Sequence, residues 1–378
     1  MLDHDIHFPT GPAPAHLEAR RFAEDIVQRL NRGSSVDLMS IINAPGQSYR
    51  EKHRALVEAL LEAKFEREVL AGNEYFLGEN EDPTTAFERL LGSDIDIEPN
   101  ISFNTKNADI IAGYKGDELK TFVFNLTKRF ENMEAAATPG QLALEIVGGG
   151  MLSVGVPMAY NTYKAMKAGE ALMVALRTGI TKIGMKTAIV AVVVVLAALL
   201  LFLFLENPKK ILGLVLNKTD KNFVVKNWNN DNKGDLFMQH GHMVDFMEDH
   251  KFADLSSEKV QIRAKIDFGD DDPESFVFAG VYFADRNVGL RGSEGVMIFT
   301  ALEDDTSFAH LFAVPYSRDN GANIALVKSR PKDMEKFFRD LYDTKKVRVD
   351  KTDGGYRLVS TVNSNRGGVV ASITMIDG

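Results

Sequence analysis

Histidine and carboxylate side chains are the residues of this chain whose types and spacing come nearest to a metal site. His240 and His242 alternate, so both imidazoles would share one face of a β-strand, and Asp245 and His250 follow them. Two imidazoles without a third ligand at a matching spacing do not define a zinc site. The sequence therefore predicts no bound metal.

Carboxylates also gather between Asp267 and Glu274, where clustered oxygen ligands would suit calcium. The spacing of an EF-hand is absent, and an acidic loop is the simpler interpretation. The Asp267-Phe-Gly269 tripeptide lacks the other elements of a kinase site, and no nucleophile elbow, HExxH helix or ordered Ser-His-Asp set is present. We therefore expect no catalytic residue, no enzyme activity and no cofactor.

Composition limits the remaining functions. The 378 residues have room for two or three domains, and the absence of cysteine excludes disulfides, thiolate metal sites and a cysteine nucleophile. The net charge of −9 argues against nucleic acid as a partner. Residues 139–210 nevertheless hold seven basic and three acidic side chains, so this segment is cationic between acidic flanks. Attraction between this cationic segment and the acidic flanks would favour a closed conformation of the soluble protein. The alternative is that the uneven charge lies only on solvated surface.

Eighteen consecutive apolar residues, Ala188–Leu205, form the most distinctive segment of the chain. As an α-helix they would span roughly 27 Å, close to the hydrocarbon thickness of a bilayer. Their transfer favours the membrane by about 6 kcal/mol. The alternative is a buried core helix or a pair of strands, since valine-rich runs also form strands. The sequence predicts a membrane-inserting segment whose side chains include Val190, Val194, Leu196, Leu200, Phe202 and Phe204.

Two preceding segments complete a predicted inserting hairpin. Ile146–Tyr163 carries no charge, although it is rich in glycine and interrupted by Pro157. Lys164–Lys186 alternates apolar and basic residues at helical spacing, as an interfacial amphipathic helix does. Representative positions of this helix are Lys164, Lys167, Leu172 and Arg177. The alternative is that Gly148–Gly150 is only a flexible turn within a helical bundle.

The regions on either side of the hairpin differ in their pattern of apolar residues. Residues 1–138 carry apolar stripes at helical spacing, and from residue 211 short β-branched and aromatic runs alternate with turn signals around one helix at Pro331–Tyr342. We therefore expect an α+β multidomain chain. Its parts would be a helical N-terminal domain over 1–138, a central transmembrane helical hairpin over 139–210 with its span at 188–205, and a C-terminal antiparallel β-sandwich over 211–378.

Four motifs within the expected sandwich follow one another in a characteristic order. Gly289–Val296 is a glycine turn leading into a strand, and Phe308–Tyr316 is a strand ending in a Val-Pro-aromatic step. Lys336–Tyr342 is an aromatic-bearing helix, and Gly355–Leu358 leads to a closing hairpin. In this order the segment from 211 to 378 resembles the actinoporins, small pore-forming cytolysins, and the wider actinoporin-like family.

The resemblance implies both an inserting helix and a headgroup site. In that family an amphipathic helix just before the first strand detaches and lines a pore, and Ala188–Leu205 occupies this place. Being apolar all round, it would need the Lys164–Lys186 face to line water. The family also binds phosphocholine through tyrosine and tryptophan rings. The candidate lipid-headgroup contacts here are Tyr316, Tyr342, Phe338 and the single tryptophan, Trp228, with ordinary sandwich aromatics as the alternative.

These features together predict a membrane-inserting, pore-forming toxin or effector that permeabilises a target membrane. Its expected partners are a lipid bilayer and further copies of itself, with a neutralising immunity protein or a secretion machinery on the producing side. No signal peptide is recognisable, so we expect a soluble cytoplasmic form that is then secreted or delivered. The alternatives are a single-pass membrane-anchored sandwich that binds lipid or glycan without forming a pore, and a fully soluble protein.

Overall fold

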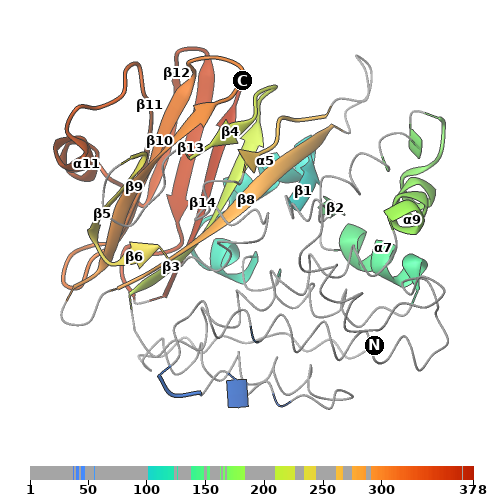
Figure 1. The fold of residues 1–378 in the computed structure, drawn as a ribbon, viewed down its shortest axis with the longest axis horizontal. Coiled ribbons are helices and arrows are strands. Elements are labelled where there is room, and N and C mark those ends of the chain that lie inside the picture. Colours follow the sequence, from blue (N-terminus) through green and yellow to red (C-terminus); the bar gives the residue numbers. More distant parts are fainter. Residues whose placement is uncertain are drawn as a thin grey trace.

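Two β-sheets organise the part of the chain that the structure describes (Figure 1). The structure is a computed structural model. It describes residues 101–122, 138–148, 151–153, 168–183, 209–225, 234–243, 261–266, 275–286, 291–367 and 369–378, together with 37, 40–41, 44–46, 55, 126, 162 and 165–166.

The larger sheet has eight strands. In order across the sheet they are β12 (Arg348–Asp353), β13 (Tyr356–Val362), β14 (Val369–Asp377), β3 (Lys210–Lys218), β8 (Phe276–Asp285), β1 (Ile101–Asn104) and β2 (Met151–Ser153), with β6 (His242–Met243) also paired to β8. Neighbouring strands are antiparallel except β14 and β3, which are parallel. The expectation of a purely antiparallel sandwich was wrong at this central pair.

The smaller sheet has six strands. In order they are β11 (Gly321–Leu326), β10 (Ser307–Val314), β9 (Ser293–Ala301), β4 (Phe223–Val224) and β7 (Gln261–Ile262), with β5 (Leu236–His240) also paired to β9. All of these pairs are antiparallel. Long apolar runs such as β10 fit this position because both faces of the sheet are covered.

The two sheets pack face to face around one apolar core. On β10, Phe308 and Phe312 belong to this core, together with Phe278 and Tyr282 of β8 and Met297 of β9. The period of two along a strand sends the intervening side chains to the opposite face. The result is a β-sandwich with buried residues on both sides of the smaller sheet.

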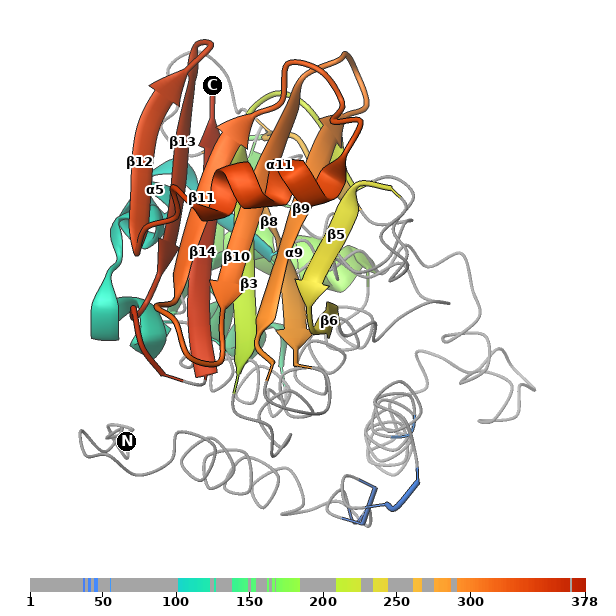
Figure 2. The ribbon, with the colours of Figure 1, turned by 90° about the vertical axis from the view of Figure 1, so that its left-hand side faces the viewer.

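Helix α11 (Met334–Tyr342) covers the outer face of the smaller sheet (Figure 2). A second apolar cluster joins Leu311 of β10 and Phe237 of β5 to Phe338 of the helix. The helix begins at Asp333, whose side chain accepts a hydrogen bond of 2.9 Å from the backbone N–H of Lys336. The sequence therefore predicted this helix correctly, with a start three residues too early.

The expected fold class was wrong for the part of the chain before β3. A separate helical domain followed by a transmembrane helical hairpin is not what the described residues form, because β1 and β2 from this region extend the larger sheet. The helices there are short: α5 (Thr105–Gly113), α7 (Pro139–Gly148) and α9 (Leu172–Ile183). Met151 and Leu152 are buried in β2, so at these two positions the lack of charge reflects burial in a protein sheet.

The predicted membrane-inserting side chains lie outside the described residues. These are Val190, Val194, Leu196, Leu200, Phe202 and Phe204, and Lys164 and Lys167 of the predicted amphipathic helix are outside as well. Leu172 and Arg177 are described: both are in α9, which contacts α7, and Arg177 is exposed while Leu172 is partly buried against the core. Among the helices of the described ranges, none is both long and apolar enough to cross a membrane.

Helix α5 is attached to the sandwich at two points. The Lys218 ammonium of β3 forms ion pairs with Asp109 of α5 at 2.7 Å and with Asp377 of β14 at 2.8 Å. The Arg348 guanidinium of β12 donates a hydrogen bond of 2.7 Å to the Ala112 carbonyl in the last turn of the helix. These contacts fasten the segment that contains β1 and α5 to three strands of the larger sheet.

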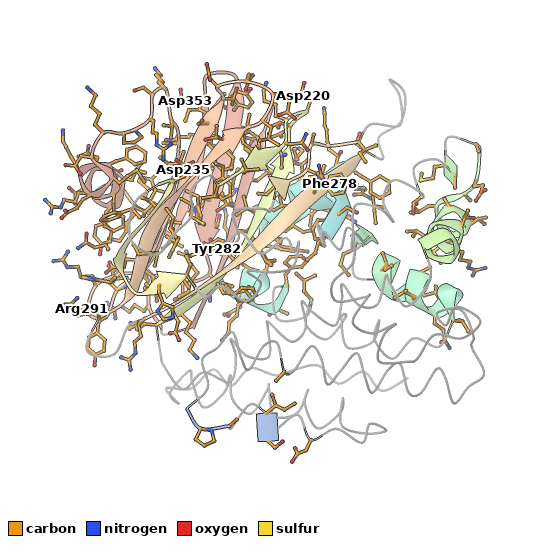
Figure 3. All side chains as sticks on the ribbon, viewed as in Figure 1. Asp220, Asp235, Phe278, Tyr282, Arg291 and Asp353 are labelled. Atoms are coloured by element: carbon orange, nitrogen blue, oxygen red, sulfur yellow. The ribbon has the colours of Figure 1, made fainter. Side chains whose placement is uncertain are left out.

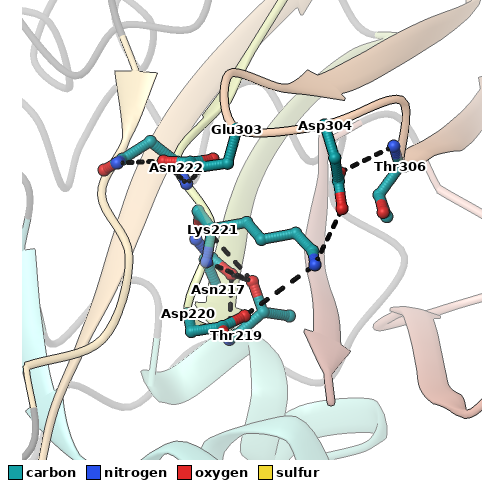
Figure 4. A network of polar contacts seen from close by, with 8 residues as sticks. All are labelled: Asn217, Thr219, Asp220, Lys221, Asn222, Glu303, Asp304 and Thr306. Carbon is teal, nitrogen blue, oxygen red and sulfur yellow. Dashed lines mark hydrogen bonds and ion pairs between the residues drawn. The ribbon is translucent and has the colours of Figure 1, made fainter.

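A polar network closes the end of the sandwich that carries Asp220 and Asp353, whereas Arg291 lies at the opposite end (Figure 3). Lys221, after β3, pairs with Asp304 in the β9–β10 loop at 3.0 Å, and the backbone N–H of Asn222 donates to Glu303 at 2.9 Å (Figure 4). The hydrogen bond to Asp304 raises the pKa of Lys221. Asp304 and Glu303 thus hold two loops together.

Candidate functional site

A pocket of about 480 Å³ opens at the Arg291 end of the sandwich, beside helix α11. We call it the α11 pocket. It is bounded by the end of β5, the start of β9, the segment after β10 and the last turn of α11. Its lining residues are Gln239, His240, Arg291, Gly292, Glu294, Pro315, Tyr316, Ser317, Arg318, Phe338, Arg339, Tyr342 and Asp343.

Two local features of the backbone shape this pocket. The pairing of β5 with β9 shifts register between Met238 and His240, which places His240 opposite Glu294. At the start of β9, a Cβ atom at Gly292 would collide with the Val314 carbonyl. Glycine there allows the start of β9 to approach the end of β10 closely, and this brings the residues after Pro315 to the pocket.

Three aromatic side chains from two segments meet at the pocket. Tyr316, on the Val-Pro-Tyr step, is 43% exposed, while Phe338 is buried and its ring centroid lies 5.3 Å from that of Tyr342. The Lys345 ammonium lies 3.6 Å from the centroid of the Tyr342 ring, a cation–π contact. The pocket therefore combines one open aromatic face with two rings anchored in the helix packing.

A buried carboxylate lies among these rings. Glu294 is only 5% exposed, and its Oε2 atom is 3.9 Å from Nε2 of His240. Burial and the hydrogen-bonded Glu294 carboxylate raise the pKa of Tyr342 to about 12, against an opposing effect of Arg318. The Tyr342 phenol stays protonated at neutral pH and donates its hydrogen bond to the Glu294 carboxylate.

Further polar groups surround the carboxylate. Arg291 and Arg318 are exposed cations at the edge of the pocket, and Arg339 pairs with Glu335 one turn earlier on α11. On the inner side, Oε1 of Gln239 and Nδ1 of His240 are buried and have no hydrogen-bond partner among the described residues. The pocket therefore presents hydrogen-bond acceptors inside and, in its exposed part, the cations Arg291 and Arg318 beside the carboxylate of Asp343.

The structure brings together three of the four aromatic residues that the sequence singled out. Tyr316, Phe338 and Tyr342 all line the α11 pocket, whereas Trp228 lies outside the described residues. Their role as headgroup contacts stays a prediction. Sequence reasoning missed Glu294, Gln239 and the arginines as members of the same site.

A usable signal for Glu294 was present in the strand pattern. Val296 and Ile298 pack toward α11, so the period of two on β9 places Glu294 on the same face. A carboxylate at that position faces the helix and its aromatic residues. The arginines gave no comparable signal, because nothing in their spacing relates positions 291, 318 and 339.

The two described histidines of the candidate metal set lie in different sheets. His240 lies in β5 of the smaller sheet, whereas His242 lies in β6 and pairs with β8 of the larger sheet. Asp245, His250 and the acidic run after Asp267 lie outside the described residues. Within the described ranges, no group of three His, Cys, Asp or Glu side chains is placed to hold a metal ion.

Comparisons with known proteins give limited similarity. No protein-family model matches the chain, and no curated protein sequence matches it. Membership of the actinoporin-like family is therefore not shown.

Three solved structures illustrate the weak likeness at the level of the fold. The lipid-binding protein Nakanori matches with 10% identity and a TM-score of 0.33, over 64% of this chain and 89% of its own. A lectin from Xerocomus chrysenteron matches with 8% identity in two structures. A substituted form has a TM-score of 0.23, over 45% of this chain and 97% of its own, and the wild type 0.21, over 44% and 99%. Sequence identities and TM-scores this low support no conclusion about the fold or the ligand of this chain.

Proposed function

We propose that this protein is a β-sandwich binding protein without catalytic activity, and that its α11 pocket takes the polar headgroup of a membrane lipid or a glycan. The main observation in support is that Tyr316, the aromatic residues of α11 and the buried Glu294 all line one pocket. Its volume of about 480 Å³ suits a ligand of headgroup or monosaccharide size.

The chemistry of the pocket supports a headgroup rather than an apolar ligand. An exposed aromatic face packs against a sugar ring or holds an ammonium group, and arginine side chains bind phosphate or carboxylate. Ligands with these groups stand at membrane surfaces and on glycoconjugates. A pocket at one end of a rigid sandwich is well placed to contact such a surface, because the sheets hold its walls in fixed positions.

Pore formation is not part of this proposal. It depended on the apolar span at 188–205, which lies outside the described residues, and no described residue supports it. The pocket supports the alternative hypothesis of a binding module that forms no pore. Assembly into oligomers, a neutralising or secretion partner, and delivery to a target membrane stay predictions from the sequence.

The test is binding of the full chain to lipid vesicles by flotation and to an array of glycans. We expect binding to at least one of these, and we expect Tyr316→Ser to weaken it about tenfold, or about 1.4 kcal/mol. The matched control is Leu302→Ser, since Leu302 is 50% exposed and lies in the β9–β10 region at the opposite end. Equal binding by the two variants would remove the α11 pocket as the site.

A further inference from the structure

The inner part of the α11 pocket is rich in hydrogen-bond acceptors. The buried Glu294 carboxylate accepts a hydrogen bond from the Tyr342 hydroxyl, whereas Oε1 of Gln239 and Nδ1 of His240 lack a hydrogen-bond partner among the described residues. The His240 tautomer that carries its proton on Nε2, 3.9 Å from Glu294 Oε2, has Nδ1 as an acceptor. Since buried acceptors without donors are costly, the natural complement is a small group with several N–H or O–H donors.

Two exposed arginines and one exposed carboxylate, Asp343, line the outer part of the same pocket, so its net charge there is positive. Arg291 and Arg318 are exposed there and line the pocket on the side of the Tyr316 segment. Arg339 lines the pocket too, but its guanidinium is paired with Glu335. Guanidinium groups bind a phosphate through paired hydrogen bonds, so the mouth suits an anionic group.

A short ligand with a donor-rich cation at one end and an anion at the other satisfies both parts. A primary ammonium supplies three N–H donors, as many as the acceptor groups that gather inside. A quaternary ammonium supplies none and would leave Gln239 and His240 without donors. A neutral sugar offers hydroxyl donors but no anion for Arg291 and Arg318.

We infer that the α11 pocket selects a phosphoethanolamine group, with its ammonium against Glu294, Gln239 and His240 and its phosphate against Arg291 and Arg318. This inference rests on the proposed function, of which it names the ligand class. Such a group occurs as a lipid headgroup and as a substituent of glycans, so the chemistry is shared by two sources. The pocket recognises the group and not the scaffold that carries it.

Calorimetric titration of the full chain with soluble O-phosphoethanolamine and with phosphocholine tests the selection. We expect phosphoethanolamine to bind at least about tenfold more tightly, which corresponds to about 1.4 kcal/mol. Glu294→Gln should abolish this preference, because it removes the negative charge that favours the ammonium. Arg291→Gln should weaken both compounds, and Lys351→Ala, an exposed position on β12, should change neither.

Flotation with phosphatidylcholine vesicles, with and without an equal amount of phosphatidylethanolamine, distinguishes the sources. Enhanced binding to the mixed vesicles identifies the lipid, whereas binding of the soluble compound alone identifies a glycan-borne group; either supports the inference. Equal affinity for the two soluble compounds, or a preference for phosphocholine, overturns it and leaves the proposed function standing. Failure to bind any vesicle, glycan or soluble compound overturns both. Should Glu294→Gln not fold, Gln239→Leu removes one acceptor and should reduce the preference for phosphoethanolamine.

Discussion

His310 lies between the two sheets with its imidazole fully buried. Its Nε2 atom is 2.7 Å from the Tyr282 hydroxyl, and its Nδ1 atom is 3.1 Å from Thr374 Oγ1 and 3.3 Å from Ser360 Oγ. A Cβ at Gly213 would collide with the Tyr282 ring, so glycine on β3 makes the room that this phenol needs. One polar cluster thus links strands of both sheets inside an otherwise apolar core.

Burial makes this cluster sensitive to acid. Loss of solvation lowers the pKa of His310 from 6.5 to about 3 in the folded protein. The unfolded chain therefore binds more protons than the folded chain between these values. The contribution of His310 to stability is complete above a pH of about 6.5, falls by up to about 1.4 kcal/mol per pH unit below it, and is lost as the pH approaches 3.

We therefore expect His310→Asn to flatten the dependence of unfolding free energy on pH. Urea denaturation at several pH values between 7 and 4 measures this for the wild type and the variant. Carboxylates titrate in the same range, so the informative quantity is the difference in slope, which should approach one proton. Parallel curves for the two proteins would show that His310 is not the acid-sensitive group.

Among the elements, α11 links the core of the sandwich to the pocket. Its apolar side joins Phe338 to Phe237 of β5, with ring centroids 5.6 Å apart, and the next turn carries Tyr342 at the pocket wall. The helix has only nine residues, so its persistence depends on this packing and on its ends. The Asp333 side chain is the described N-terminal cap.

Asp333→Ala should loosen α11 and weaken the site together. Loss of the cap is expected to cost about 1 kcal/mol of unfolding free energy, and ligand affinity should fall because Phe338 and Tyr342 are held less firmly. Thermal denaturation and the vesicle or glycan binding assay measure the two effects. Lys332→Ala, at the exposed preceding position, is the matched control and should leave both unchanged. Normal binding by a destabilised Asp333→Ala protein would contradict the coupling of helix and pocket.

At the scale of the whole molecule, Lys218 joins segments that are far apart in the sequence. Its side chain is only 8% exposed and pairs with Asp109 of α5 and Asp377 of β14. A buried ammonium with two carboxylates is stabilising only while all three groups are present, since its removal leaves two negative charges close together. The attachment of α5 to the sandwich therefore depends in part on this residue, beside the Arg348 contact.

Lys218→Met keeps the length of the side chain and removes its charge. We expect amide hydrogens of α5 and β1 to exchange about tenfold faster, because the free energy of local opening should fall by about 1–2 kcal/mol. This value is kept small because the Asp109 side chain is 44% exposed and solvent screens its charge. Lys351→Met, on the exposed side of β12, should have no effect on these amides. Unchanged exchange in the Lys218 variant would show that packing alone attaches the segment.

The sequence predicted the elements whose signal is local. Strand β10 is a long apolar run that ends at a Val-Pro step, and α11 follows a helical period, so both were located within a few residues. The β1 and β2 strands span only four and three residues, too few to show a period, and their place is set by pairing with β8 and with each other. The parallel pairing of β3 with β14 is likewise a tertiary property.

The residues of the α11 pocket were likewise predicted only in part. Tyr316, Phe338 and Tyr342 were singled out through the resemblance to the actinoporin-like family, and all three line the α11 pocket. The charged partners come from separate strands and loops, and only the folded arrangement places Arg291 and Arg318 near Glu294. The sequence alone therefore could not predict that these charged residues from distant segments lie close together.

The parallel pair β3–β14 has a consequence for the order of folding. Its partners are about 159 residues apart in the sequence, and β14 separates β3 from the β12–β13 hairpin. During synthesis β3 leaves the ribosome long before β14, so the larger sheet cannot be completed when its first central strand is made. Until the final strand is made, β3 can pair with β8 on one side only, and closure over so long a loop makes the assembly of this sandwich slow.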